Sequence, residues 1–120
     1  MACEVEHTDE FEAWWKTLTE AEQADVAATV ELLQEHGAQL PFPYSSGIAS
    51  SRHSHMRELR VQSGGDPIRV FYAFDPRRMA ILLIGGDKAG NDRFYEEFVR
   101  MADDLYDQHL VELRKEKLIK

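Results

Sequence analysis

The pattern of apolar and polar positions divides the chain into an N-terminal helical half, a set of strands and a last helix. Helical spacing predicts one helix over residues 8–18 and a second over residues 19–37, the second with Val26, Val30 and Leu33 on one apolar stripe. The expected end signals are two N-caps and a glycine stop, namely Thr8, Thr19 with Glu22 in a capping box, and Gly37.

Strand-like alternation occupies the middle of the chain. Residues 56–62 and 68–74 alternate between apolar and polar positions, and a Gly-Gly-Asp-Pro turn at residues 64–67 joins them. Residues 79–88 contain an unbroken apolar run, which is expected of a strand whose two faces are both partly covered. A short strand is also expected within residues 2–7. The short connections between the three central strands imply an antiparallel meander.

The remaining segments are a long loop and a long helix. Residues 40–54 contain two prolines and five serines, a composition typical of a loop. The length of this loop indicates a functional or mobile segment. Asn91 or Asp92 is expected to cap a helix that runs to the C-terminus. Its predicted apolar stripe consists of Phe94, Phe98, Met101 and Leu105. This order predicts one α+β domain over residues 1–120, with an N-terminal helical hairpin and a C-terminal helix packed on one face of a small antiparallel sheet.

Composition and charge restrict the class of protein. No apolar run approaches the roughly 18 residues of a membrane span, the N-terminus lacks the features of a secretory signal, and the single Cys3 fits a reducing compartment. We therefore expect a cytoplasmic protein without membrane association. The net charge of −8 is unevenly distributed, because residues 1–51 carry −9, residues 52–93 carry +3 and residues 94–120 carry −2. A local polyanion site in the middle segment is compatible with this distribution, whereas broad binding to nucleic acid is not.

Strand alternation indicates where the arginines of the hairpin point. Arg60 and Arg69 fall on the face opposite the predicted core, and Phe71 lies on the same face as an exposed ring. Two arginines and an aromatic ring on a helix-free face suit a phosphate flanked by a stacked base. Glu58 shares that face. Arg57 has the parity of the core residues but lies at the strand end, where its side chain can turn outward.

Further candidates lie after the third strand and before the hairpin. Lys88 ends the strand, and Arg93 and Tyr95 belong to the first turn of the last helix, where a cation would close the end of the open face. His53 and His55 form an H-x-H pair without a third ligand at metal spacing, so we expect no metal site. The two histidines are either solvated loop residues or proton-transfer groups.

Together these motifs resemble a known toxin family. The sequence ELR at 58–60, the Gly-Gly turn, IRVFYAFD at 68–75 and LLIGGDKAGNDRFYEE at 82–97, following a helical hairpin, resemble the HigB-like branch of the RelE/ParE toxin superfamily and its phage-derived relatives. The resemblance covers roughly residues 3–115. It implies a RelE-like fold and the toxin of a type II toxin–antitoxin system, a ribosome-dependent mRNA endonuclease that halts translation. The implied partners are the ribosome, mRNA and a HigA-like helix-turn-helix antitoxin, without sequence-specific DNA binding by this chain alone.

The resemblance also implies site residues. The arginine of the family's ELR motif falls on Arg60, that of its following strand on Arg69, and the lysine at its last strand end on Lys88. The implied reaction is attack of the RNA 2′-OH on the adjacent phosphate without a metal or other cofactor, with these cations clamping the phosphate. The base stays open between Glu58, His53, His55 and Tyr95. The predicted catalytic residues are Arg60, Arg69, Lys88, Tyr95 and Glu58, and the predicted RNA-binding residues are Arg57, Phe71, Arg93 and His55.

Two other functions are compatible with the same sequence. A ParE-like gyrase inhibitor would share the fold and would need no phosphate clamp. A non-catalytic interaction module would keep the fold without the activity. A neighbouring gene for a small helix-turn-helix protein would favour both toxin functions over the module.

Overall fold

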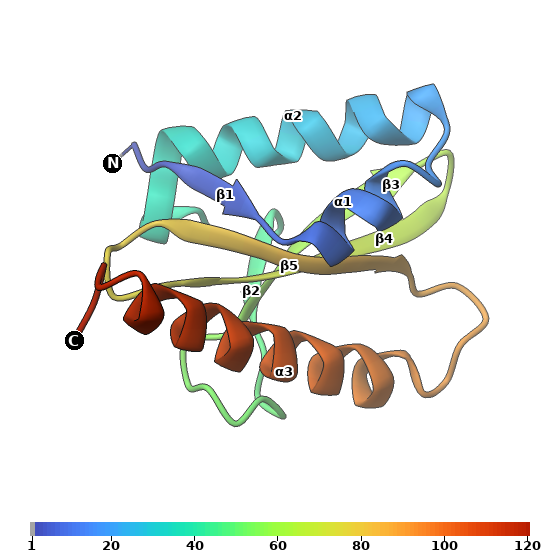
Figure 1. The fold of residues 1–120 in the computed structure, drawn as a ribbon. Helices are drawn as coiled ribbons and strands as arrows, with labels where there is room; N and C mark the ends of the chain where they lie inside the picture. The colour runs from blue at the N-terminus through green and yellow to red at the C-terminus, as the bar shows by residue number, and fades with distance from the viewer. Residues whose placement is uncertain (1) are drawn as a thin grey trace.

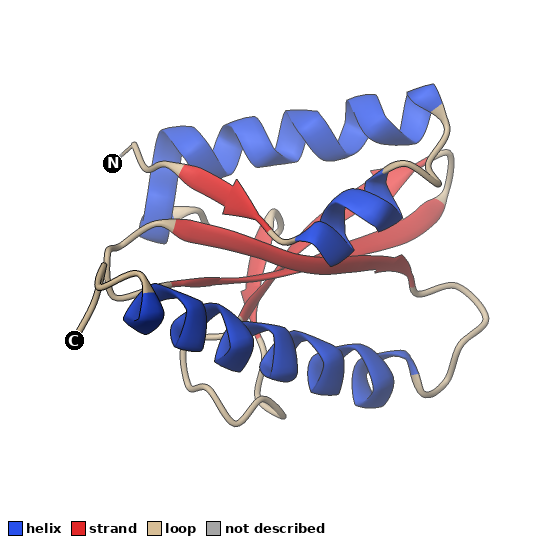
Figure 2. Cartoon of the chain, in the orientation of Figure 1, coloured by secondary structure: helices blue, strands red, loops and turns tan. Residues whose placement is uncertain are grey.

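The computed structural model describes residues 2–120, which form a sheet with helices packed against both of its faces (Figure 1 and Figure 2). The strands are β1 (Val5–His7), β2 (Ser45–Gly47), β3 (Arg57–Ser63), β4 (Asp66–Phe74) and β5 (Ala80–Asp87). The helices are α1 (Asp9–Trp15), α2 (Glu20–His36) and α3 (Phe94–Lys115), with a 3-10 turn at Gly37–Gln39. The predicted α+β class is confirmed. Among the helices of residues 2–120, none has the length and apolar character needed to cross a membrane.

The strands lie in the order β1-β5-β4-β3-β2. The predicted meander of β3, β4 and β5 is present, but the sheet is mixed because β1 pairs in parallel with β5. Gly64 and Gly65 join β3 to β4 with φ angles of 58° and 88°, a left-handed conformation that glycine adopts without a Cβ clash. This two-residue turn fixes the register, in which Arg60 lies opposite Arg69.

Helices α1 and α2 begin at the predicted caps and α2 ends at the predicted glycine, whereas α1 ends at Trp15, earlier than predicted. The Thr8 side chain caps α1 by accepting a hydrogen bond from the Phe11 N–H at 2.9 Å. At the start of α2, the Thr19 side chain accepts from the Glu22 N–H at 3.1 Å, while the Glu22 carboxylate accepts from the Thr19 N–H at 2.8 Å. Gly37 ends α2 with a φ of 58°. These caps satisfy backbone groups that helix termini leave unpaired.

The helices cover both faces of the sheet, with α1 and α2 on one side and α3 on the other (Figure 1). One core includes Phe11, Val26, Leu33, Leu59, Val61, Val70 and Tyr72. The other includes Phe71, Ala73, Ile81, Leu83, Phe94, Val99 and Tyr106. The expectation of helices on one face only is therefore wrong. Helices pack on both faces because β4 and β5 carry apolar side chains on both, and each apolar face must be shielded from water.

Three local expectations also differ from the structure. The serine-rich loop contains β2, whose residues Ser45–Gly47 pair with the start of β3. Helix α3 begins at Phe94 rather than at Asn91 or Asp92; the Asn91 side chain instead accepts from the Arg93 N–H at 3.0 Å. Met101, predicted to be buried, is 40% exposed. The other predicted stripe residues, Phe94, Phe98 and Leu105, do pack in the core, together with Val99, Ala102 and Tyr106.

Candidate functional site

Four side chains predicted to act in catalysis meet on the α3 side of the sheet. Strand β3 contributes Glu58 and Arg60, β4 contributes Arg69, and the first turn of α3 contributes Tyr95. Residues two apart on one strand, and residues directly opposite on neighbouring strands, project to the same face, so the hairpin register brings the three strand residues together. We refer to Glu58, Arg60, Arg69 and Tyr95 as the Glu58 cluster.

The Glu58 carboxylate is the centre of this cluster. The Tyr95 hydroxyl donates a hydrogen bond to Glu58 Oε1 at 2.7 Å. Arg69 Nε lies 3.5 Å from the same oxygen, and Arg60 Nη1 lies 3.6 Å from Oε2. The Glu58 side chain is only 5% exposed, so its charge depends on these partners. In turn, the carboxylate reduces the repulsion between two arginines that lie directly opposite each other on adjacent strands.

Arg69 lies below the surface, which corrects the expectation that it occupies an open face. Its side chain is 4% exposed. Its Nη1 donates to the Ile68 carbonyl at 3.0 Å, and Nε is a buried donor without a hydrogen-bond partner among residues 2–120. By contrast, the Arg60 side chain is 30% exposed. Arg69 is therefore placed to hold Glu58, whereas Arg60 is the arginine of the cluster that a ligand reaches from solvent.

The expectation that Phe71 presents an exposed ring is wrong. Phe71 is fully buried, and its ring centroid lies 6.1 Å from that of Tyr95 and 5.9 Å from that of Phe94, because α3 covers this face. The aromatic ring beside the arginines is instead that of Phe42, which was not predicted. Its centroid lies 5.1 Å from the guanidinium carbon of Arg60. The available sequence signal was an aromatic residue between two prolines in the long loop.

Tyr95 is held in its protonated form, and Lys88 lies beside it. Burial raises the pKa of Tyr95, and its hydrogen bond to the Glu58 carboxylate raises the pKa further, against an opposing effect of Arg69. The ammonium of Lys88 lies 5.5 Å from the Tyr95 ring centroid. The Lys88 backbone N–H donates to the Pro67 carbonyl at 3.0 Å, which ties the end of β5 to β4. Lys88 therefore adds a cation at the edge of the Glu58 cluster.

Arg57 and Arg93 are engaged with residues outside the Glu58 cluster. Arg57 Nε donates to the Ser45 hydroxyl at 2.9 Å, so this side chain bridges β3 to β2. Arg93 pairs with Glu96 one turn along α3 at 3.0 Å, and its side chain is 72% exposed. The predicted roles of these two arginines in RNA binding stay predictions.

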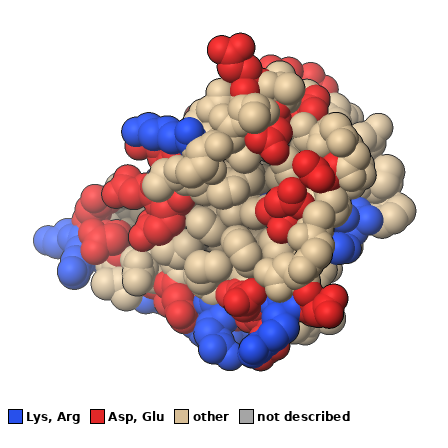
Figure 3. Space-filling view, turned by 90° about the vertical axis from the view of Figure 1, so that its right-hand side faces the viewer, with Lys and Arg blue, Asp and Glu red and all other residues tan. Residues whose placement is uncertain are grey.

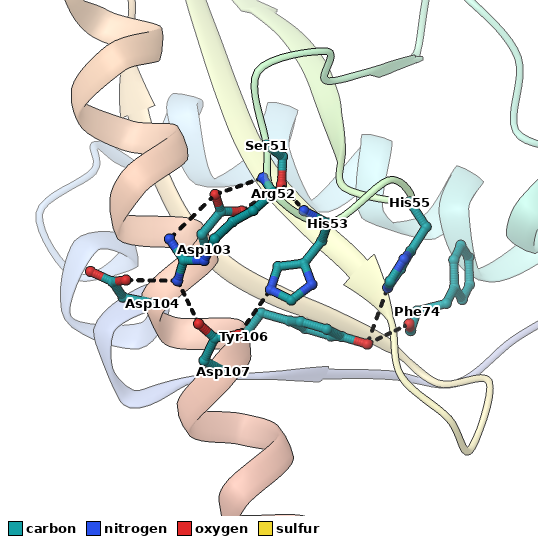
Figure 4. A network of polar contacts seen from close by, with 9 residues as sticks. All are labelled: Ser51, Arg52, His53, His55, Phe74, Asp103, Asp104, Tyr106 and Asp107. Carbon is teal, nitrogen blue, oxygen red and sulfur yellow. Dashed lines mark hydrogen bonds and ion pairs between the residues drawn. The ribbon is translucent and has the colours of Figure 1, made fainter.

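The two histidines of the loop contact α3 (Figure 4). The His53 side chain is 19% exposed and so differs from the expected solvated loop residue, whereas His55 is exposed as expected. His53 Nε2 lies 2.9 Å from Asp107 Oδ1, and His55 Nε2 lies 3.2 Å from the Tyr106 hydroxyl. The neighbouring Arg52 forms ion pairs with three carboxylates of α3, those of Asp103, Asp104 and Asp107. Within residues 2–120, no group of three or more His, Cys, Asp or Glu side chains is arranged to hold a metal ion.

Charged side chains on the face drawn in Figure 3 are mixed rather than segregated. Figure 3 shows the face that lies on the right of Figure 1, where acidic side chains are spread widely and Lys and Arg form small groups, several of them next to acidic side chains. The net charge of +3 on residues 52–93 therefore does not produce one continuous positive surface on this face. A phosphate ligand would depend on local contacts rather than on a broad field.

The arrangement of these elements defines the class of fold. The structure is similar to that of an arginine-to-alanine double mutant of the Escherichia coli toxin RelE in the free state, with a TM-score of 0.60 and 14% identity over 83% of this chain and 97% of that chain. It is also similar to an archaeal RelE–RelB complex from Pyrococcus horikoshii, with a TM-score of 0.55 and 13% identity over 76% of this chain and 100% of that chain. At these identities the likeness establishes the RelE fold.

Sequence comparison identifies the family. The model of the phage-derived Gp49-like proteins (DUF891) matches residues 13–107. The Mycobacterium tuberculosis protein named "Putative toxin HigB2" is 36% identical over 111 residues, 91% of this chain and 55% of the relative, so the chain spans about half of that protein. The one named "Putative toxin HigB3", of the same organism, is 40% identical over 95 residues, 78% of this chain and 82% of the relative. The chain therefore belongs to the Gp49-like, HigB-like family with the RelE fold, and the predicted resemblance is confirmed.

Proposed function

We propose that the protein is the toxin of a type II toxin–antitoxin system and that it cleaves mRNA in the ribosomal A site through the Glu58 cluster. Relatives named as HigB toxins and structural neighbours of the RelE type support the toxin assignment. The observation that supports catalysis is the buried Glu58 carboxylate, held by Arg69 and Tyr95 and adjacent to the accessible Arg60.

The proposed reaction is a transesterification at phosphorus. The 2′-oxygen of a ribose forms a bond to the adjacent phosphorus, and the bond from phosphorus to the 5′-oxygen of the next nucleotide breaks. One proton leaves the 2′-hydroxyl and another is added to the departing 5′-oxygen. The products are a 2′,3′-cyclic phosphate and a 5′-hydroxyl, and negative charge on the pentavalent phosphorane needs stabilisation in between.

The geometry suggests a role for each residue of the site. Arg60 stabilises the charge on the phosphate oxygens. Glu58 is as buried as Arg69 and holds Arg60 in place, so the acceptor of the 2′-hydroxyl proton stays open between Glu58, His53 and His55. Lys88 donates a proton to the 5′-oxygen or stabilises its charge. Arg69 and Tyr95 act through Glu58 and are positioning residues, because burial separates Arg69 from solvent and the Tyr95 hydroxyl is committed to the carboxylate. Each histidine contacts α3 through Nε2, His53 at Asp107 and His55 at Tyr106, and a contact at one ring nitrogen does not prevent the other from acting as a base.

A cognate antitoxin of the HigA-like, helix-turn-helix type is the proposed protein partner. Two observations support it: the HigB names of the relatives, and the complex of RelE with RelB among the structural neighbours. A gene for a small helix-turn-helix protein next to this one, and co-purification of the two products, would test the partnership.

Expression in bacterial cells separates the candidate functions. We expect the wild-type protein to arrest growth and to generate new mRNA 5′ ends in phase with codons. Arg60→Ala should relieve the arrest, whereas Arg114→Ala, which changes an exposed arginine in the last turn of α3, should not. Arrest without codon-phased ends, accompanied by altered DNA supercoiling, would favour a gyrase inhibitor. Absence of arrest by a folded protein would favour the non-catalytic module.

A further inference from the structure

The segment between α2 and β2 displays an exposed aromatic ring next to the Glu58 cluster. Phe42 is 68% exposed, more than any other large apolar side chain within residues 2–120. Exposing a ring of this size to water is unfavourable unless a partner covers it. The guanidinium of Arg60, 5.1 Å from the ring centroid, lies at cation–π distance and leaves most of the ring uncovered.

The backbone on both sides of Phe42 is anchored. Leu40 is 3% exposed and packs in the core beneath α2. Ser45 is 1% exposed, and its hydroxyl lies 2.6 Å from that of Tyr72. The Tyr44 carbonyl accepts a hydrogen bond from the Arg60 N–H at 2.9 Å. The anchored backbone therefore keeps Phe42 beside Arg60, although its ring contributes little to the core.

An exposed aromatic ring beside an accessible arginine can bind both parts of a nucleotide, the base on the ring and the phosphate at the guanidinium. The phosphate of single-stranded RNA binds cations, and its unstacked base gains free energy by stacking on an aromatic side chain. On this surface the accessible cation is Arg60, and Phe42 is the ring in contact with it. The buried Phe71 offers no such face.

We propose that Phe42 is the stacking platform for a nucleobase of the RNA strand whose phosphate contacts Arg60. This inference rests on the proposed function and extends it, because it assigns a base-binding subsite to a loop that carries no catalytic group. The contact is with the aromatic face of the base, so it tolerates any base and contributes to substrate affinity more than to the chemical step.

The test is the cleavage of an A-site codon in programmed ribosomes by purified wild type, Phe42→Ala, Phe42→Trp and Val111→Ala. Val111 is 46% exposed on α3 and serves as the matched exposed apolar control. Phe42→Ala should raise KM about 5- to 150-fold, the change expected from about 1–3 kcal/mol of stacking per base, with a smaller effect on kcat. Phe42→Trp should restore KM, and Val111→Ala should leave it unchanged.

Each other outcome is decisive. If the wild type cleaves and Phe42→Ala cleaves with the same KM, the stacking platform is overturned while the proposed function stands. If Phe42→Ala instead loses binding to the cognate antitoxin and keeps the wild-type KM, the ring belongs to a protein interface and the platform is again overturned. If the wild type does not cleave at all, the proposed function fails and the platform fails with it.

Discussion

Replacing Arg69 by methionine tests the buried ion pair at the centre of the site. The substitution keeps a long apolar side chain but leaves the Glu58 carboxylate, 5% exposed, without the cation at 3.5 Å from Oε1. Removing one partner of a buried pair costs about 3–5 kcal/mol. We expect about 3 kcal/mol, the low end, because Arg60 and Tyr95 still contact the carboxylate. For a chain of this length, that loss lowers Tm by about 10 °C or more.

The assay is urea unfolding of a double-mutant cycle. Glu58→Gln and Arg69→Met are each compared with wild type and with the double variant, and Arg114→Met serves as the exposed control. Each single variant leaves one buried group without its partner. The loss of unfolding free energy in the double variant should therefore be smaller than the sum of the two single losses by about 1–3 kcal/mol.

Two results would show that Arg69 and Glu58 do not form a buried, coupled pair. If the effects of the two single variants add to within about 0.5 kcal/mol, the two side chains are not coupled. If Arg69→Met destabilises the protein no more than Arg114→Met does, Arg69 is not buried. The same experiment has a bearing on toxicity assays: because Arg69→Ala should destabilise the fold, loss of growth arrest in that variant would not by itself identify a catalytic role, whereas Arg60→Ala avoids this ambiguity.

Three further predictions test other contacts. Tyr95→Phe should lower the cleavage rate about tenfold or more with the fold retained, since it removes the hydroxyl that donates to the Glu58 carboxylate; an unchanged rate would exclude a role in positioning. Burial acts to raise the pKa of Asp75, but hydrogen bonds from His109, Arg77 and the Met79 backbone hold that pKa below the ordinary value of 3.8. The ionised carboxylate therefore stabilises the fold above that pH, and the stabilisation is lost as the pH falls through the lowered pKa. Asp75→Asn should therefore reduce the free energy of unfolding at pH 7, with the difference from wild type shrinking below about pH 4; a difference independent of pH would contradict the assignment. Gly85→Ala would place a Cβ 2.4 Å from the Trp14 ring and should destabilise the protein by about 1–3 kcal/mol in urea unfolding, whereas an unchanged midpoint would show that the ring moves freely.

Local signals in the sequence were sufficient for most of the helices and strands. Thr19 and Glu22 predicted the start of α2, and the Gly64-Gly65 turn predicted the hairpin, because caps and turns depend on a few adjacent residues. Alternation correctly placed Arg60 and Arg69 on one face of the hairpin, since the strand period determines this without knowledge of the tertiary structure.

The sequence was insufficient to predict burial and pairing that depend on long-range packing. Alternation assigns a residue to a face but does not show whether a helix covers that face, so Phe71 and Arg69 were expected at the surface and are buried by α3. Strand β2 has the sequence Ser-Ser-Gly, which carries no strand signal and forms by pairing with β3. Met101 follows the helical spacing of Phe94, yet it alone of the predicted stripe is exposed, because the docking of α3 determines how far its buried face extends.

The products of mRNA cleavage in a purified system show whether the protein carries out the proposed reaction. Wild type and Arg60→Ala are added to ribosomes holding a defined codon in an empty A site, and the ends of the RNA fragments are analysed chemically. We expect a cut within that codon that leaves a 2′,3′-cyclic phosphate and a 5′-hydroxyl. We also expect a large loss of rate in Arg60→Ala with the fold retained, because Arg60 is the accessible arginine of the cluster. Intact mRNA with folded wild-type protein, or equal cleavage by both proteins, would contradict the proposed function.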